Sequence, residues 1–208
     1  MGKSNIYLLL LIYLIAIAEA SKLTVPRHSR IRAFVETQCQ TTRYPKLCVH
    51  CLSSYVNSTT QSPQQLAHVA LRVSLARANY ARAYLIKVAK EMRQSKAKEY
   101  QAMKDCLDQI NDGVHQLTRS VKELQRIEIE DEYGFVWHQS NVQSWTSAAL
   151  TDALTCMDGF SGYSRGGKTR AIVKAKVLNV AQVTSNALAL FGRYVTKHHS
   201  SHSIKPQP

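Results

Sequence analysis

The sequence predicts an all-α protein: an up-and-down four-helix bundle preceded by an N-terminal helical hairpin and stapled by disulfides. Three observations lead to this fold class. Several long segments place apolar residues on one face at helical spacing, no segment alternates as a β-strand does, and five cysteines follow a secretion signal. About 188 residues remain once the signal is removed, which is enough for one sizeable core.

Residues 1–20 have the features of a removable secretion signal. Lys3 precedes an apolar run from Ile6 to Ala18, and Ala18-Glu19-Ala20 supplies a small-residue cleavage site before Ser21. The run is too short for a membrane-spanning helix. We therefore expect the mature protein to be secreted and to fold in an extracellular, oxidising compartment.

The hairpin and the first long helix each have a local signal. The region 31–56 is rich in cysteine and contains Tyr44-Pro45, which favours a turn between two short helices. Ser62-Pro63 supplies an N-cap and a first-turn proline for a long amphipathic helix.

The rest of the chain predicts three further helices. They are expected at about 98–130, 141–157 and 169–195. The helical domain thus covers 31–196, with the hairpin at about 31–56 and the bundle at about 63–196. The tail 197–208, which contains three histidines and two prolines, is expected to be disordered.

The cysteines are read first as disulfide partners. Cys39 and Cys48 flank the proline turn, so a bridge between them would staple the hairpin. Cys106 lies on the apolar stripe of the second bundle helix and Cys156 near the end of the third, so a bridge there would lock two antiparallel helices. Chain-entropy estimates give about 3 kcal/mol for the short closure and about 4 kcal/mol for the long one.

The fifth cysteine has no obvious partner. Cys51 lies three residues from Cys48 on an expected helix, where a disulfide would be strained. We expect it to be a buried free thiol, and an intermolecular bridge is the alternative. A zinc site has less support, because no histidine lies at matched spacing to a second cysteine pair.

The chain is strongly basic, with a formal net charge of +13. The signal contains one lysine and one glutamate, so the mature chain keeps this excess. Such charge favours electrostatic contact with a polyanion such as acidic pectin, and simple solubility is the alternative. The secreted setting, and the lack of a basic helix with interleaved aromatics, argue against nucleic acid. Asn57-Ser58-Thr59 is a glycosylation sequon, so Asn57 is a candidate glycosylation site.

The loop before the last helix matches two enzyme motifs. Residues 162–169 fit the phosphate-binding pattern G-x-x-x-x-G-K-S/T, and Gly162-x-Ser164-x-Gly166 fits the hydrolase elbow. Both motifs need a preceding β-strand, whereas residues 147–157 read as helix. The histidines form no catalytic or metal-binding constellation. We therefore expect no catalytic residue, nucleotide, metal or cofactor.

A polar stripe runs along the third bundle helix. Ser147, Thr151, Thr155 and Asp158 all fall within about 60° of Ser144 around the helix at 100° per residue. Small hydroxyl side chains make a shallow surface that another protein can approach closely. The alternatives are an ordinary solvated face, or small residues that admit a neighbouring helix of the same bundle.

Four segments carry a resemblance to a known family. Residues 39–48 read C-x-x-T-x-Y-P-x-L-C and are followed by Leu52, which resembles the opening signature of the plant invertase and pectin methylesterase inhibitors. The runs S-A-A-L-T at 147–151 and T-C-M-D-G-F at 155–160 resemble the third-helix signature of that family. The run T-S-N-A-L-A-L at 184–190 is similar to its last helix.

The resemblance implies a four-helix bundle with an N-terminal hairpin, bridges Cys39–Cys48 and Cys106–Cys156, and an unpaired fifth cysteine. Invertase inhibitors resemble one another in a Pro-Lys-Phe element between the last two helices, and residues 161–169 lack it. The matched runs look more like pectin methylesterase inhibitors, and also like the pro-regions of esterase precursors.

The implied function is that of a secreted inhibitor of pectin methylesterase in the plant cell wall or apoplast, and not of an enzyme. It would form a one-to-one complex in which the second, third and fourth bundle helices cover the substrate cleft of the esterase, with the polar stripe in the interface. Inhibition of acid invertase, or pectin binding without inhibition, remain alternatives.

Overall fold

The computed structural model describes residues 27–56, 60, 62–127, 132–159 and 167–202. The expected signal 1–20, the sequon at Asn57 and most of the glycine-rich loop lie outside these ranges. Over the described ranges the chain forms six helices and no strand. They are α2 (Arg27–Cys39), α3 (Pro45–Leu52), α4 (Pro63–Gln94), α5 (Tyr100–Arg126), α6 (Glu132–Gly159) and α7 (Lys168–His202).

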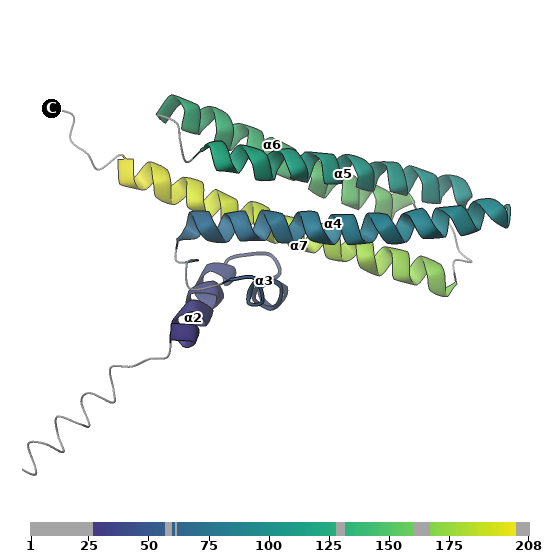
Figure 1. The fold of residues 1–208 in the computed structure, drawn as a ribbon, viewed down its shortest axis with the longest axis horizontal. Helices are drawn as coiled ribbons and strands as arrows, with labels where there is room; N and C mark the ends of the chain where they lie inside the picture. The colour runs from purple at the N-terminus through teal and green to yellow at the C-terminus, as the bar shows by residue number, and fades with distance from the viewer. Residues whose placement is uncertain (1–26, 57–59, 61, 128–131, 160–166, 203–208) are drawn as a thin grey trace, which may run out of the picture.

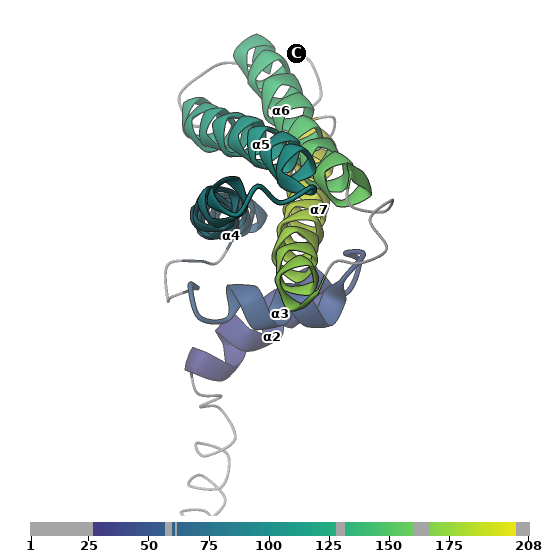
Figure 2. The same cartoon turned by 90° about the vertical axis from the view of Figure 1, so that its right-hand side faces the viewer.

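The four long helices form the expected bundle, and the two short ones form a hairpin beside it (Figure 1). Around the bundle, α4 packs against α5, α5 against α6, α6 against α7, and α7 against α4. Helices α4 and α6 therefore lie at opposite corners, as Figure 2 shows in the view along the bundle. The α2–α3 hairpin contacts α7 and α4. The predicted all-α fold class is confirmed.

Helix α4 begins at the predicted cap. The Ser62 hydroxyl accepts a hydrogen bond from the Gln65 backbone N–H, and the Gln65 side chain accepts one from the Ser62 N–H, each at 3.2 Å. This reciprocal pair of hydrogen bonds satisfies two backbone N–H groups that have no acceptor within the helix, and Pro63 has no N–H that needs one. The helix ends before Lys96, whose φ of 51° turns the chain toward α5.

Helix α6 begins at Glu132, nine residues before the predicted start at Asn141. Gly134 lies within the first turn and does not prevent the helix from starting at Glu132. The buried side chains of Phe135 and His138 hold this extension on the bundle.

The expectation of a disordered tail from Lys197 is wrong for the first part of that tail, because α7 continues to His202. The His198 ring stacks on Phe135 of α6, with centroids 3.6 Å apart and planes 10° apart. The His199 ring meets the same phenyl ring edge-on at 5.6 Å. These ring contacts stabilise the end of α7 against α6, and the composition of the tail alone does not predict them. Residues 203–208 lie outside the described ranges.

The apolar faces of the four long helices meet in one core that reaches under the hairpin. None of the helices in the described ranges combines the length and apolar character that a membrane crossing requires. The largest fully buried side chains include Leu66, Leu71, Leu85, Met103, Ile110, Leu117, Leu124, Leu190 and Phe191.

Candidate functional site: the outer face of helix α6

The polar stripe of α6 faces solvent. Ser144, Thr151, Thr155 and Asp158 are exposed and Ser147 is half-buried, whereas the opposite side of the helix points into the core. The stripe therefore does not admit another helix of the bundle. The Thr151 hydroxyl donates to the Ser147 carbonyl of its own helix at 3.1 Å, which leaves the stripe a smooth outer surface.

Leu154 brings an apolar side chain to this surface. Its side chain is 44% exposed and lies beside Thr155. The outer surface of α6 therefore mixes apolar and polar side chains, as protein-binding surfaces commonly do.

Two aromatic residues that sequence reasoning missed extend the stripe toward the start of α6. Tyr133 is 89% exposed and Trp137 is 68% exposed. At 100° per residue both fall within about 40° of Thr151 around the helix. The seven-residue spacing of Trp137, Ser144, Thr151 and Asp158 could have shown that Trp137 belongs to the stripe. The predicted helix began only at Asn141, however, so Trp137 was not considered part of it. Exposed tryptophan and tyrosine are the side chains most often found as anchors of protein interfaces.

Helix α5 fixes the position of this face from behind. Cys106 of α5 and Cys156 of α6 are disulfide-bonded, with their Cα atoms 4.2 Å apart. Thr155 is the direct chain neighbour of Cys156, so the bridge holds the stripe at its C-terminal half. Farther along the pair, Thr146 donates a hydrogen bond to the Ser120 hydroxyl at 3.2 Å, and both residues are buried.

The two helices are also in close contact at Gly113. A Cβ atom there would lie 3.6 Å from the Ala149 carbonyl oxygen and 3.7 Å from Asp152 Cβ, which are van der Waals distances, so an added methyl group would pack directly against α6. Burial raises the pKa of Asp152, and the nearby charge of Asp112 raises it further. The Oδ2 atom of Asp152 is buried without a hydrogen-bond partner in the described structure.

A buried carboxylate joins α5 to the N-terminal half of α6. Glu123 accepts hydrogen bonds from His138 Nδ1 at 2.8 Å and from Asn141 Nδ2 at 2.7 Å, and Arg126 Nη1 lies 3.3 Å away. Burial by itself would raise the pKa of Glu123. The hydrogen bonds from His138 and Asn141, with the charges of His138 and Arg126, outweigh that effect and lower the pKa. The carboxylate thus ties down the segment that carries Trp137.

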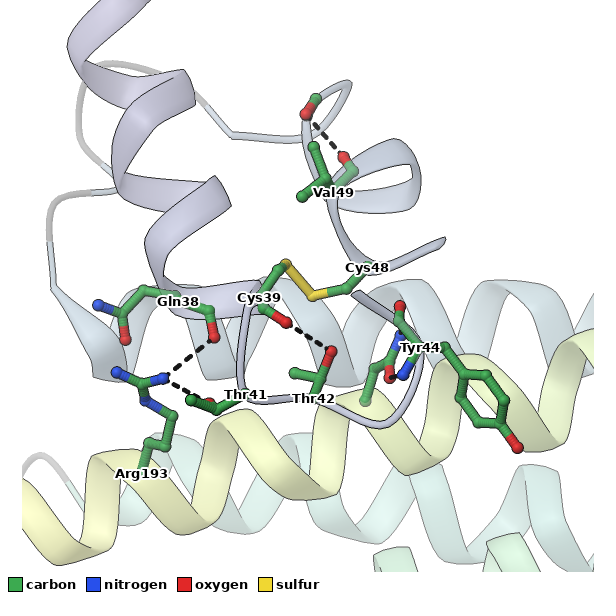
Figure 3. The surroundings of a disulfide bond; sticks show 10 residues. Gln38, Cys39, Thr41, Thr42, Tyr44, Cys48, Val49 and Arg193 are labelled. Atoms are coloured by element: carbon green, nitrogen blue, oxygen red, sulfur yellow. Dashed lines mark hydrogen bonds between the residues drawn. A yellow bond between two sulfur atoms is a disulfide. The ribbon is translucent and has the colours of Figure 1, made fainter. Parts of the chain in front are cut away.

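The hairpin is held to α7 on another side of the molecule (Figure 3). Cys39 and Cys48 are disulfide-bonded across the turn, with Cα atoms 5.7 Å apart. Asn186 of α7 donates to the Tyr44 carbonyl and accepts from the Tyr44 N–H, each at 3.0 Å. Arg193 of α7 donates to the Gln38 carbonyl at 3.4 Å and to the Thr41 hydroxyl.

Cys51 is free and buried, as expected, with 4% of its surface exposed. The thiol cannot reach another chain unless the hairpin opens, which argues against an intermolecular bridge. No cluster of three metal-ligating side chains occurs within the described residues. The segment that precedes the glycine-rich loop is helical to Gly159, so neither enzyme motif has the strand it needs, and Ser164 itself lies outside the described residues.

The chain is similar to known inhibitors over most of its length. The family model for "Plant invertase/pectin methylesterase inhibitor" matches residues 33–190. Pectinesterase inhibitor 9 of Arabidopsis thaliana is 45% identical over 200 residues, which cover 94% of this chain and 96% of that protein. The 21 kDa protein of Daucus carota is 41% identical over 165 residues, or 79% of this chain and 85% of that one.

A solved structure shares the fold. The crystal structure of a mutant form of a pectin methylesterase inhibitor from Arabidopsis superposes with a TM-score of 0.58 and 19% identity, over 76% of this chain and 95% of that chain. From the family model and these two close relatives, we conclude that the chain belongs to the plant invertase/pectin methylesterase inhibitor family.

Proposed function

We propose that this chain, a pectin methylesterase inhibitor-type protein, inhibits a pectin methylesterase by laying the outer face of α6 over the substrate cleft of the enzyme in a one-to-one complex. The observation that carries the proposal is the 45% identity, over nearly the whole chain, to a protein named as a pectinesterase inhibitor. The predicted secretion signal supports a complex formed outside the cell, and we propose the plant cell wall as its site.

The proposed mechanism needs a rigid surface and no chemistry from the inhibitor. The outer face of α6 offers exposed anchors, Trp137 and Tyr133, and a low hydroxyl stripe that ends at Thr155 and Asp158. The disulfide and the buried contacts between α5 and α6 order this face before binding, which reduces the entropy lost on association.

The first test is a titration of purified plant pectin methylesterase with the oxidised protein, run beside acid invertase. Stoichiometric loss of esterase activity, with a break at one inhibitor per enzyme, is the expected result. Inhibition of invertase alone would overturn the assignment of the target. High salt separates inhibition from simple wall binding, because a packed helix interface survives it and charge-only attraction does not.

Two variants test the interface. Thr155→Arg places a long charged side chain on the stripe, and Trp137→Ala removes the largest exposed anchor; we expect each to raise the inhibition constant at least about tenfold. Thr37→Arg makes the same change at an exposed threonine of α2 and serves as the matched control. If Thr155→Arg and Trp137→Ala inhibit as well as the parent, another face binds the enzyme.

A further inference from the structure

The charge of the bundle is divided unevenly between its helices. Helix α4 carries six lysines and arginines against one acid, and α7 carries six against none. Helix α5 carries four of each, and α6 carries three acids and no lysine or arginine. Because α4 and α7 are neighbours, most of the positive charge of the described helices lies on one flank of the molecule, away from the outer face of α6.

A pocket opens on this flank where the hairpin meets the bundle. It lies between α3, α4 and α7 and has a volume of about 470 Å³. Its polar lining includes His50, Arg77, Tyr80, Lys176 and Asn179. The volume falls within the range typical of small-ligand sites, so the pocket can accept a group the size of a sugar.

None of the described residues that line the pocket carries a carboxylate. Lys176 Nζ lies over the rings of Tyr80 and Tyr84, at 4.2 and 4.9 Å from their centroids, which fixes the ammonium group at the pocket wall. Neither Lys176 nor Arg77 belongs to an ion pair among the described residues. The single acid of α4, Glu91, is instead paired with Lys87. Two cations that line one pocket without a carboxylate among the lining residues are stabilised by an added anion.

We propose that this pocket binds an acidic polysaccharide, with a uronate carboxylate between Arg77 and Lys176. The Asn179 amide and the Tyr80 hydroxyl can hydrogen-bond to sugar hydroxyls, and the half-buried apolar lining can cover the face of a sugar ring. The other lysines and arginines of α4 and α7 extend the positive surface beyond the pocket, which suits a chain of repeating carboxylates.

This binding does not depend on the proposed inhibition of an esterase. The pocket shares no residue with the outer face of α6, and α4 and α6 occupy opposite corners of the bundle (Figure 2). The protein can therefore hold a polysaccharide with one flank while the outer face of α6 stays free.

Isothermal titration calorimetry with a defined de-esterified oligogalacturonate tests the proposal. The double substitution Arg77→Gln/Lys176→Gln removes two charges from the pocket, and Lys104→Gln/Lys122→Gln removes two exposed charges from α5 as the matched control. At 150 mM salt, we expect the pocket variant to lose affinity at least about tenfold. We expect the control to change less than about twofold, since distant charges are screened. The pocket variant should inhibit the esterase like the parent, because Arg77 and Lys176 line the pocket beside the hairpin and not the outer face of α6, which separates this test from that of the proposed function.

Two further ligands and one further variant complete the design. The methyl-esterified oligomer should bind at least about tenfold more weakly, because it lacks the carboxylate charge. Tyr80→Ala, at a residue 63% exposed, provides a second pocket variant with little risk to folding, and it should weaken binding too. Equal losses in the pocket and α5 variants would overturn the proposal in favour of diffuse charge attraction. Equal binding of the esterified oligomer, or tighter binding of a sulfated oligosaccharide, would overturn the uronate assignment.

Discussion

Replacing Asn186 with alanine tests how the hairpin is held to the bundle. The Asn186 side chain is 3% exposed and makes two 3.0 Å hydrogen bonds with the backbone of Tyr44, one as donor and one as acceptor. These bonds connect Tyr44, the residue directly before Pro45 in the hairpin turn, to the middle of α7. Asn186→Ala removes both bonds, so the Tyr44 N–H loses its partner while the Tyr44 carbonyl keeps only the bond from the Cys48 N–H.

The structure sets the size of the effect. The Tyr44 N–H loses its partner at a cost of about 1–2 kcal/mol, the lower half of the usual range, because Tyr44 is only half-buried. The Tyr44 carbonyl still accepts a hydrogen bond from the Cys48 N–H at 2.9 Å, so losing its second bond costs about 1 kcal/mol. Alanine returns about 0.5 kcal/mol, since it favours the helix more than asparagine does. We therefore expect the free energy of unfolding to fall by about 2 kcal/mol and the melting temperature by about 4–8 °C.

Urea denaturation followed by circular dichroism measures the loss of stability, and hydrogen exchange locates it. Amide protection should fall most in α3, whose start depends on the Tyr44 contact. Gln182→Ala, one turn away on α7 at a half-buried position, is the control for the loss of an amide side chain from this helix. A loss below about 0.5 kcal/mol with unchanged exchange in α3 would refute the reasoning, and would leave the hairpin held by its disulfide and apolar contacts alone.

Three more predictions concern the contacts behind the α6 face. Because the pKa of Glu123 is lowered, its carboxylate stabilises the fold above the usual glutamate pKa, and this stabilisation is lost as pH falls through the pKa of the folded state. Glu123→Gln should therefore be less stable than the parent at pH 7 and should lose less stability on acidification. Urea denaturation at several pH values from 7 to 3 would show this. Cys106→Ser/Cys156→Ser removes the disulfide that closes a 50-residue loop and should lower the free energy of unfolding by about 4 kcal/mol. Removing the hairpin disulfide, which closes nine residues, should lower it by about 2.6 kcal/mol, and denaturation of both variants would show the difference. Equal losses would mean that chain entropy is not the main cause. The raised pKa of Asp152 marks an ionised form that opposes folding above that pKa, so Asp152→Asn should melt at a higher temperature at pH 7 and gain nothing at pH 3; thermal melts at both pH values check this, and a lower melting temperature at pH 7 would contradict it.

The helices and their arrangement could be predicted because local pattern determines them. The two residues Ser62-Pro63 mark the start of α4, and apolar residues at helical spacing identify the buried face of α5 without any knowledge of its partners. The polar stripe of α6 was predictable for the same reason, since the residues that define it lie within one helix.

What could not be predicted depends on contacts between distant parts of the chain. The histidines of the tail are helical because Phe135, about sixty residues earlier, gives them a surface to stack on. The role of Asn186 is set by Tyr44, 142 residues away, although the run around Asn186 was recognised as characteristic. The structural role of the Glu123 carboxylate depends on hydrogen bonds from His138 and Asn141, which lie on the following helix.

The uneven charge of the helices gives the molecule a permanent electric dipole across its short axis. With the positive end at α4 and α7 and the weakly negative end at α5 and α6, an anionic matrix attracts one flank and repels the other. The protein would therefore adsorb in a preferred orientation rather than at random. In that orientation the tryptophan-bearing side of α6 points away from the matrix, toward the solution from which an enzyme arrives.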